Sequence, residues 1–213
     1  MPNVLVFCDL NDGKLKKASR EALSIGRTLA ASAGGDLFAF ACGSAGAALA
    51  GDVGKYGAKR LLVASDAQFD AYQSETCTAA AKTAVDAAQA GVIVLPGTSN
   101  GRDLAPRLAA RLDAGVASDA VSLEWTDGKL RARRLLYSGR VIATVEIDST
   151  PAIATCRPNA FPPAETGGGA AEVANLDVQV GETKSRLVEV NVPEVGEISI
   201  AEAEIIVSGG RGL

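Results

Sequence analysis

Short apolar runs alternate with helical periodicity over the first half of the chain. Four continuous apolar runs predict buried strands, at residues 3–8, 37–42, 59–64 and 92–95. Apolar residues at three- and four-residue steps predict helices, at residues 15–33, 75–89 and 104–112, with a shorter one ending near Gly54. Strands that alternate with helices pair in parallel, and continuously apolar strands are covered on both faces. Residues up to about 113 therefore predict an α/β fold with a parallel, doubly wound sheet.

The pattern changes after Asp119. Two β-rich runs, 120–126 and 129–137, flank Asp127-Gly128, a pair typical of two-residue hairpin turns. A third run, 140–147, alternates apolar with polar residues, as a strand with one covered face does. These runs predict an antiparallel β meander appended to the parallel sheet.

The last part of the chain mixes short strands with polar segments. Residues 151–156 and 187–192 predict two further strands, with a loop rich in proline and glycine between them. An acidic linker is expected next, and then the apolar run 205–207 leads into a glycine-rich turn. We expect one domain over residues 1–192, and over 193–213 a linker with the first strand and turn of a second, nucleotide-binding domain.

Composition and charge exclude several classes of protein. The chain has 213 residues, 47% of them apolar, and a net charge of −4, so nucleic acid is not an expected partner. No apolar run reaches the roughly 18 residues of a membrane span, and no membrane insertion is expected. The absence of histidine argues against a hydrolase triad or catalytic zinc, so we expect no catalytic or metal-binding residues. The four cysteines form no CxxC pair, which favours a reducing compartment.

Charge is unevenly distributed along the second half. Basic residues cluster over 129–140, and the segment 187–204 carries five glutamates without lysine or arginine. Each segment is either a solvated surface or a docking surface for a partner.

Two loops at predicted strand ends could hold an anion. Residues 96–103 form a glycine-flanked polar loop before a helix, where backbone N–H groups and Arg102 could bind a phosphate. An ordinary capped turn explains the same residues. Gly43-Ser44-Ala45-Gly46 is a weaker example. Asp9 and Asp66 also follow predicted strands. An aspartate there could bind a ribose or a metal, but it is more commonly a helix cap or a turn former.

Several segments together resemble the alpha subunit of electron transfer flavoprotein. The similarity runs through the loop and helix at 97–112, Ala117-Ser118-Asp119, the meander from 134 to 146, the loop 161–164 and the terminal 207–212. Their order and spacing agree over essentially the whole chain. The resemblance implies an N-terminal domain similar to the adenine nucleotide α-hydrolase type of fold.

The resemblance also implies a function and partners. In that family, alpha and beta subunits form a heterodimer that accepts electrons from flavin dehydrogenases, acyl-CoA dehydrogenases of fatty acid β-oxidation among them. The heterodimer passes the electrons to a membrane quinone oxidoreductase. The family's FAD lies mainly in a C-terminal domain beyond Leu213, so this chain alone is expected to hold none. Gly209, Gly210 and Arg211 match the start of that domain and are expected to be peripheral to FAD.

The resemblance favours a non-catalytic scaffold for electron transfer. A stand-alone module that binds an adenine nucleotide through the 97–102 loop is the alternative, and a nucleotide-dependent enzyme is a third. The expected compartment is the bacterial cytoplasm, or the mitochondrial matrix in a eukaryote. The electron donor, and whether the loop binds any ligand, are left open.

Overall fold

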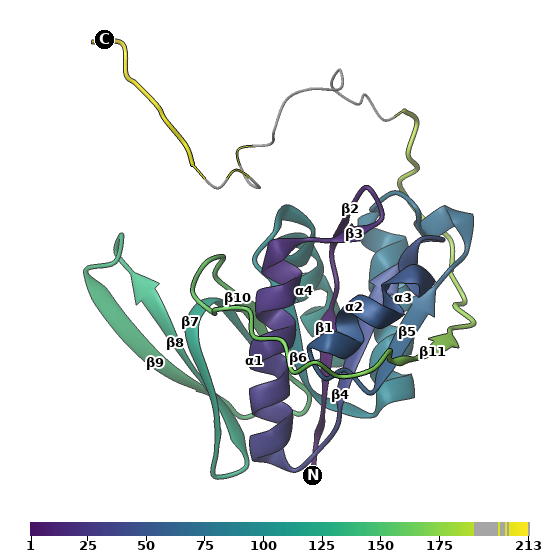
Figure 1. Cartoon of the computed structure of the whole chain (residues 1–213), viewed down its shortest axis with the longest axis horizontal. Coiled ribbons are helices and arrows are strands. Elements are labelled where there is room, and N and C mark those ends of the chain that lie inside the picture. The colour runs from purple at the N-terminus through teal and green to yellow at the C-terminus, as the bar shows by residue number, and fades with distance from the viewer. Residues whose placement is uncertain (190–199, 201–202, 204, 213) are drawn as a thin grey trace.

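The computed structural model describes residues 1–189, 200, 203 and 205–212 (Figure 1). Its strands are β1 (Asn3–Phe7), β2 (Leu10–Asn11), β3 (Lys14–Leu15), β4 (Leu37–Cys42), β5 (Arg60–Ala64), β6 (Ala90–Pro96), β7 (Val116–Thr126), β8 (Lys129–Leu136), β9 (Val141–Ile147), β10 (Ala152–Cys156) and β11 (Glu172–Asn175). Its helices are α1 (Lys17–Ala33), α2 (Ala50–Lys55), α3 (Ser74–Ala88) and α4 (Ser99–Leu112), with short 3-10 turns at η1 (Gly46–Leu49) and η2 (Ala67–Phe69). All the strands and helices predicted between residues 3 and 156 are present.

One mostly parallel sheet dominates the described part of the chain. Its nine strands run in the order β11-β5-β4-β1-β6-β10-β7-β8-β9, and β2 and β3 form a separate small antiparallel pair. The strands from β11 to β7 pair in parallel, whereas β7, β8 and β9 pair antiparallel to their neighbours. The predicted α/β class with a doubly wound parallel sheet is confirmed.

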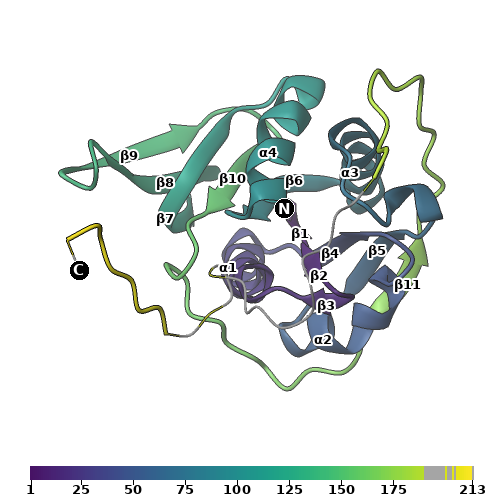
Figure 2. The same cartoon turned by 90° about the horizontal axis from the view of Figure 1, so that it is seen from above.

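Helices cover both faces of the parallel part, as its continuous apolar strands require. Successive β1 residues divide between two cores: Val4 and Val6 belong to one, and Leu5 and Phe7 to the other. Helices α1 and α2 pack on the first face and α3 and α4 on the second (Figures 1 and 2). Because both sides of these strands are buried, their sequence shows no polar alternation.

The predicted antiparallel meander is present, and it continues the same sheet. Strand β10 returns to lie between β6 and β7, with Ile153 opposite Ile93 on one side and Val116 on the other. The β7–β8 turn has positive φ at Asp127 and Gly128 (53° and 78°), as the hairpin signal predicts. The strands β7–β9, here called the arm, project beyond the helices (Figure 2).

The predicted loop rich in proline and glycine is a long connection that crosses the α1 and α2 face. Residues 157–171, here called the strap, lead from β10 to β11 at the far edge of the sheet (Figure 1). The strap is held by backbone bonds: Thr166 N–H donates to Lys55 O, and Ala171 N–H donates to Ala50 O. Strand β11 then pairs in parallel with β5.

Two predicted strands near the C-terminus are wrong in the residues that can be checked. Residues 187–189 have no strand structure, and the rest of the predicted strand 187–192 lies outside the described residues. Residues 205–207 are exposed and also not in a strand. An apolar run needs a neighbouring strand to complete its hydrogen bonds, and the described sheet ends at β11 and β9. Among the described residues, no helix combines the length and apolarity needed to cross a bilayer.

Candidate functional site

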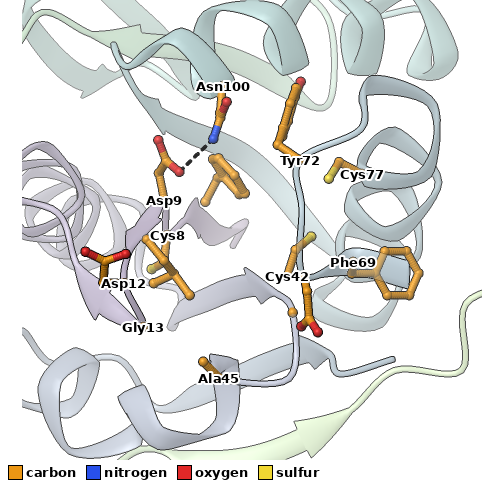
Figure 3. A pocket seen from close by; sticks show the side chains of 14 residues that line it. Cys8, Asp9, Asp12, Gly13, Cys42, Ala45, Phe69, Tyr72, Cys77 and Asn100 are labelled. Carbon is orange, nitrogen blue, oxygen red and sulfur yellow. Dashed lines mark hydrogen bonds between the residues drawn. The ribbon is translucent and has the colours of Figure 1, made fainter. Parts of the chain in front are cut away.

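The carboxyl ends of the central strands surround an open cavity of about 300 Å³ (Figure 3). The chain runs from β1 outward to β4 and β5, then returns to place β6 on the other side of β1. In sheets of this kind, the loops that diverge at such a point form the usual ligand crevice. The cavity lies there, lined by residues that follow β1 and β4 and by Asn100 of α4.

A buried carboxylate connects the loops on either side of this point. Asp9 is only 4% exposed. Its Oδ2 forms an ion pair with Lys16 Nζ at 3.0 Å, and its Oδ1 accepts a hydrogen bond from Asn100 Nδ2, also at 3.0 Å. Ser19 Oγ binds both the N–H and the carbonyl of Asp9. With both carboxylate oxygens occupied, Asp9 fixes the position of α4 relative to α1.

This network depends on β1 and β6 being neighbours in the sheet. Asp9 follows β1 and Asn100 follows β6, and the carboxyl ends of adjacent parallel strands meet at one edge of a sheet. Asp66, in contrast, has the commoner role proposed for it. Its carboxylate accepts a hydrogen bond from Gln68 N–H and caps η2.

The glycine-flanked loop at 96–103 is a capped turn in the structure. Thr98 Oγ1 accepts a hydrogen bond from Gly101 N–H at 3.2 Å, which caps α4. A Cβ at Gly97 would lie 2.4 Å from Cys156 O, and one at Gly101 would lie 2.0 Å from Pro96 O. Close packing therefore explains both glycines without a ligand. Arg102 is exposed and makes no ion pair with a described residue.

The Gly43–Gly46 loop also has a structural explanation. Gly43 has φ of 98°, a conformation that favours glycine. Asp70 Oδ1 accepts a short hydrogen bond from Ser44 N–H, at 2.6 Å. This bond holds the pKa of Asp70 below its ordinary value. The Ser44 N–H is thus already used by Asp70.

Charged residues gather around the bulge where β7 separates from β10. Asp119 has a positive φ of 60° and forms an ion pair with Arg157. Its pKa is lowered mainly by the hydrogen bond from Arg157 and further by the charges of Arg102 and Arg134. A second cavity of about 450 Å³ opens beside it, with Arg102 at its edge. Arg157, Arg102 and Arg134 all lie near the Asp119 carboxylate. Because three positive charges surround one negative charge, this end of the sheet is positive.

The basic segment 129–140 divides into paired and unpaired cations. Lys129 pairs with Asp148 and Arg131 with Glu146, both across the arm. Arg134 has a buried Nε without a hydrogen-bond partner among the described residues. Arg133 is exposed and forms no ion pair with a described residue. The arm therefore retains positive charge that could bind a partner.

The residues predicted to lie near a flavin are exposed. Gly209, Gly210 and Arg211 have no strand or helix around them. A Cβ added at Gly210 would have no atom within 4 Å, so nothing in the described structure requires glycine there. These residues do not form a cradle for a cofactor by themselves. Among the described residues, no cluster of three or more cysteine, aspartate or glutamate side chains is arranged to bind a metal.

Comparisons with known proteins agree on one family. The family model for the electron transfer flavoprotein domain matches residues 4–180, which include the whole sheet and the strap. Protein FixB of Clostridium saccharobutylicum is 32% identical over 215 residues, covering 99% of this chain and 64% of its own length. Electron transfer flavoprotein subunit alpha of Bacillus subtilis strain 168 is 30% identical, with coverages of 99% and 64%.

A third relative carries a different name. The acryloyl-CoA reductase electron transfer subunit beta of Anaerotignum propionicum is 27% identical and covers 99% of this chain and 66% of its own length. This chain thus spans about 64% of the length of the first two relatives and a similar share of the third.

Proposed function

Because this chain belongs to the electron transfer flavoprotein family, we propose that it acts as the N-terminal domain of an alpha-type subunit and supports electron transfer. The observation that carries the proposal is the extent of the family match, which runs from β1 through the strap to β11. The carboxyl edge of the sheet adds support. Its buried carboxylate, Asp9, is engaged by Lys16 and Asn100, so it is a structural link and not a free acid or base.

The proposed role is that of a scaffold. The domain docks a beta subunit and positions a flavin domain that relays electrons from flavin dehydrogenases, including the acyl-CoA type, to a quinone oxidoreductase. FAD supplies the redox chemistry in such a complex. Because Gly209, Gly210 and Arg211 form no cradle, we assign the main FAD contacts to residues outside this chain and a peripheral position to these three. A bacterial cytoplasm suits relatives from Clostridium and Bacillus.

A flavin-retention experiment tests where the FAD site lies. The purified chain is incubated with excess FAD, dialysed, and examined by visible absorption. We expect no flavin to remain, since the described residues present no site that encloses it. Stoichiometric retained flavin would mean that these 213 residues hold a complete site, and the scaffold assignment would be wrong. Titration with AMP in parallel tests the alternative, a module that binds an adenine nucleotide alone.

The arm is the proposed docking surface for the beta subunit. Arg133 and Arg134 form no ion pair with a described residue, and Arg134 Nε is buried without an acceptor, so carboxylates or carbonyl oxygens of a partner would complement this surface. Reversing both charges (R133E with R134E) should weaken binding of a co-expressed beta subunit by about tenfold or more, mainly through faster dissociation. Surface plasmon resonance measures both rates.

A matched control separates docking from general charge effects. Arg111 is exposed in the last turn of α4, outside the arm, so R111E should leave beta-subunit affinity within about twofold. If R133E with R134E also leaves beta-subunit affinity within about twofold, and circular dichroism shows that this variant is folded, the docking surface lies elsewhere.

A further inference from the structure

Two of the four cysteine thiols meet at the wall of the central cavity. Cys42 ends β4, and Cys77 lies in the first turn of α3; both line the cavity of about 300 Å³. In Figure 3, the sulfur atom of each residue lies on the side that faces the other residue. The two residues are far apart in the sequence, so no CxxC spacing marks them. The sheet and α3 bring them together.

The pair also differs chemically from the other thiols. The neighbouring Cys42 thiol lowers the pKa of Cys77, and the Cys77 thiol, together with burial, raises the pKa of Cys42. The N-terminus of α3 adds to this, because it favours a thiolate in its first turn. Burial raises the pKa of Cys8 to about 12 and also raises that of Cys156. The thiolate, which is the reactive form, is therefore favoured at Cys77 and not at the other three cysteines.

Cys42 gives a small reagent access to the pair. The cavity opens to solvent at the carboxyl edge of the sheet, and Cys42 is only partly buried. Cys156 lies in the core on the α1 face and does not line this cavity. Cys8 lines the cavity and, like Cys77, is 1% exposed, but its Sγ points to the Val6 carbonyl at 3.8 Å.

We propose that Cys42 and Cys77 form a reversible redox site, in which a hydroperoxide converts the two thiols into a disulfide between β4 and α3. This modification site is independent of the proposed electron-transfer function. The disulfide would join the two elements that form one wall of the cavity. Oxidation would thus fix the shape of the cavity.

The reaction balances with hydrogen peroxide as the oxidant. The Cys77 thiolate attacks one peroxide oxygen, an S–O bond forms, the O–O bond breaks, and the leaving hydroxide takes the thiol proton to become water. Cys42 sulfur then attacks Cys77 sulfur, an S–S bond forms, the S–O bond breaks, and the second hydroxide takes the Cys42 proton. Two thiols lose two electrons in total, and the peroxide is reduced to two waters.

Peptide mapping tests the proposal directly because trypsin separates all four cysteines. Cys42 falls in the tryptic peptide 28–55 and Cys77 in 61–82, whereas Cys8 falls in 1–14 and Cys156 in 141–184, because trypsin does not cleave between Arg157 and Pro158. The folded chain is treated with hydrogen peroxide, blocked with iodoacetamide in denaturant, and digested. We expect peptides 28–55 and 61–82 to be linked, the intact mass to fall by two hydrogens, and dithiothreitol to reverse both changes.

Variants make the result specific. C42S and C77S should each abolish the link, whereas C8A, which alters a thiol on the same cavity, should leave it in place. If both serine variants fail to fold, the linked peptide from the wild-type chain still decides the question. Three outcomes would overturn the proposal. In the first, peroxide adds oxygen to single cysteines and no link forms. In the others, the link involves Cys8 or a second chain, or it forms only in denaturant.

Discussion

Glu21 places a carboxylate beneath the strap, at 2% exposure. Its Oε2 accepts a hydrogen bond from Asn159 N–H at 2.8 Å, which fixes the beginning of the strap on α1. Burial raises the pKa of Glu21, and the hydrogen bond only partly offsets this. Glu21 therefore joins α1 to the strap through its hydrogen bond with Asn159, although burial disfavours its charged form.

Two substitutions separate these effects. E21A leaves the Asn159 N–H without its acceptor and should lower the free energy of unfolding by about 1–3 kcal/mol. E21Q keeps an acceptor and removes the buried charge, so it should cost less than E21A. Urea unfolding at pH 7 measures both. Equal losses in the two variants would show that the hydrogen bond contributes little.

The pH dependence of E21Q follows from the raised pKa. A folded-state pKa above the unfolded value means that the folded chain binds this proton more tightly, so the contribution of Glu21 to stability is present at low pH and lost as pH rises through the folded pKa. The free energy of unfolding of E21Q, relative to that of the wild type, should therefore be higher at pH 8 than at pH 4. Urea midpoints at both pH values check the sign, and the opposite trend would mean that the carboxylate is favoured by folding.

At the scale of elements, α2 meets the strap through bare backbone. A Cβ at Gly54 would lie 2.0 Å from Gly169 O, whereas one at Gly51 would have no atom within 4 Å. Both glycines are in the same helix, where glycine is disfavoured relative to alanine. The strap therefore leaves no space for a side chain at position 54, whereas a side chain at position 51 would contact nothing.

This pair of glycines gives opposite predictions for one substitution. G51A should raise the free energy of unfolding by about 0.5–1 kcal/mol through helix propensity. G54A should lower it by about 1–3 kcal/mol, because the strap backbone has to move away. Thermal unfolding of the two variants beside the wild type measures both. A stabilising G54A would show that the strap is loosely held.

The elements that the sequence predicts correctly are those with a local signal. Strands β1, β4, β5 and β6 are continuous apolar runs, and the Asp127-Gly128 turn dictates the β7–β8 hairpin. Strand β11 has no such run: it forms because the edge of β5 offers hydrogen bonds and Arg60 pairs with Glu172. The place of β10 between β6 and β7 was also missed, since periodicity does not say which edge a strand joins.

The candidate site divides in the same way. The capped turn at 96–103 and Asp66 as a cap or turn former follow from local chemistry and are confirmed, with Thr98 as the residue that caps α4. The link from Asp9 to Asn100 and the facing thiols depend on which strands are neighbours, so they appear only once the sheet order is known. Gly209, Gly210 and Arg211 remain a prediction.

At the scale of the whole molecule, one sheet serves two purposes. Its parallel half is enclosed by helices, and the carboxyl edge there holds the cavity and the thiol pair. Its antiparallel half, the arm, is largely uncovered: Val141 and Ile142 of β9 are about half exposed, and β9 is the edge strand among the described residues. A scaffold needs both properties, a rigid body and an open surface for a partner.

The position of β10 has a consequence for synthesis on the ribosome. Val92 of β6 pairs with Ala152 of β10, so the apolar edge of β6 stays open while the whole arm is being translated. An open strand edge can recruit a strand from a neighbouring nascent chain. Substitutions that delay the arm should therefore reduce the yield of soluble protein in cells more than they lower the melting temperature of the molecules that complete folding.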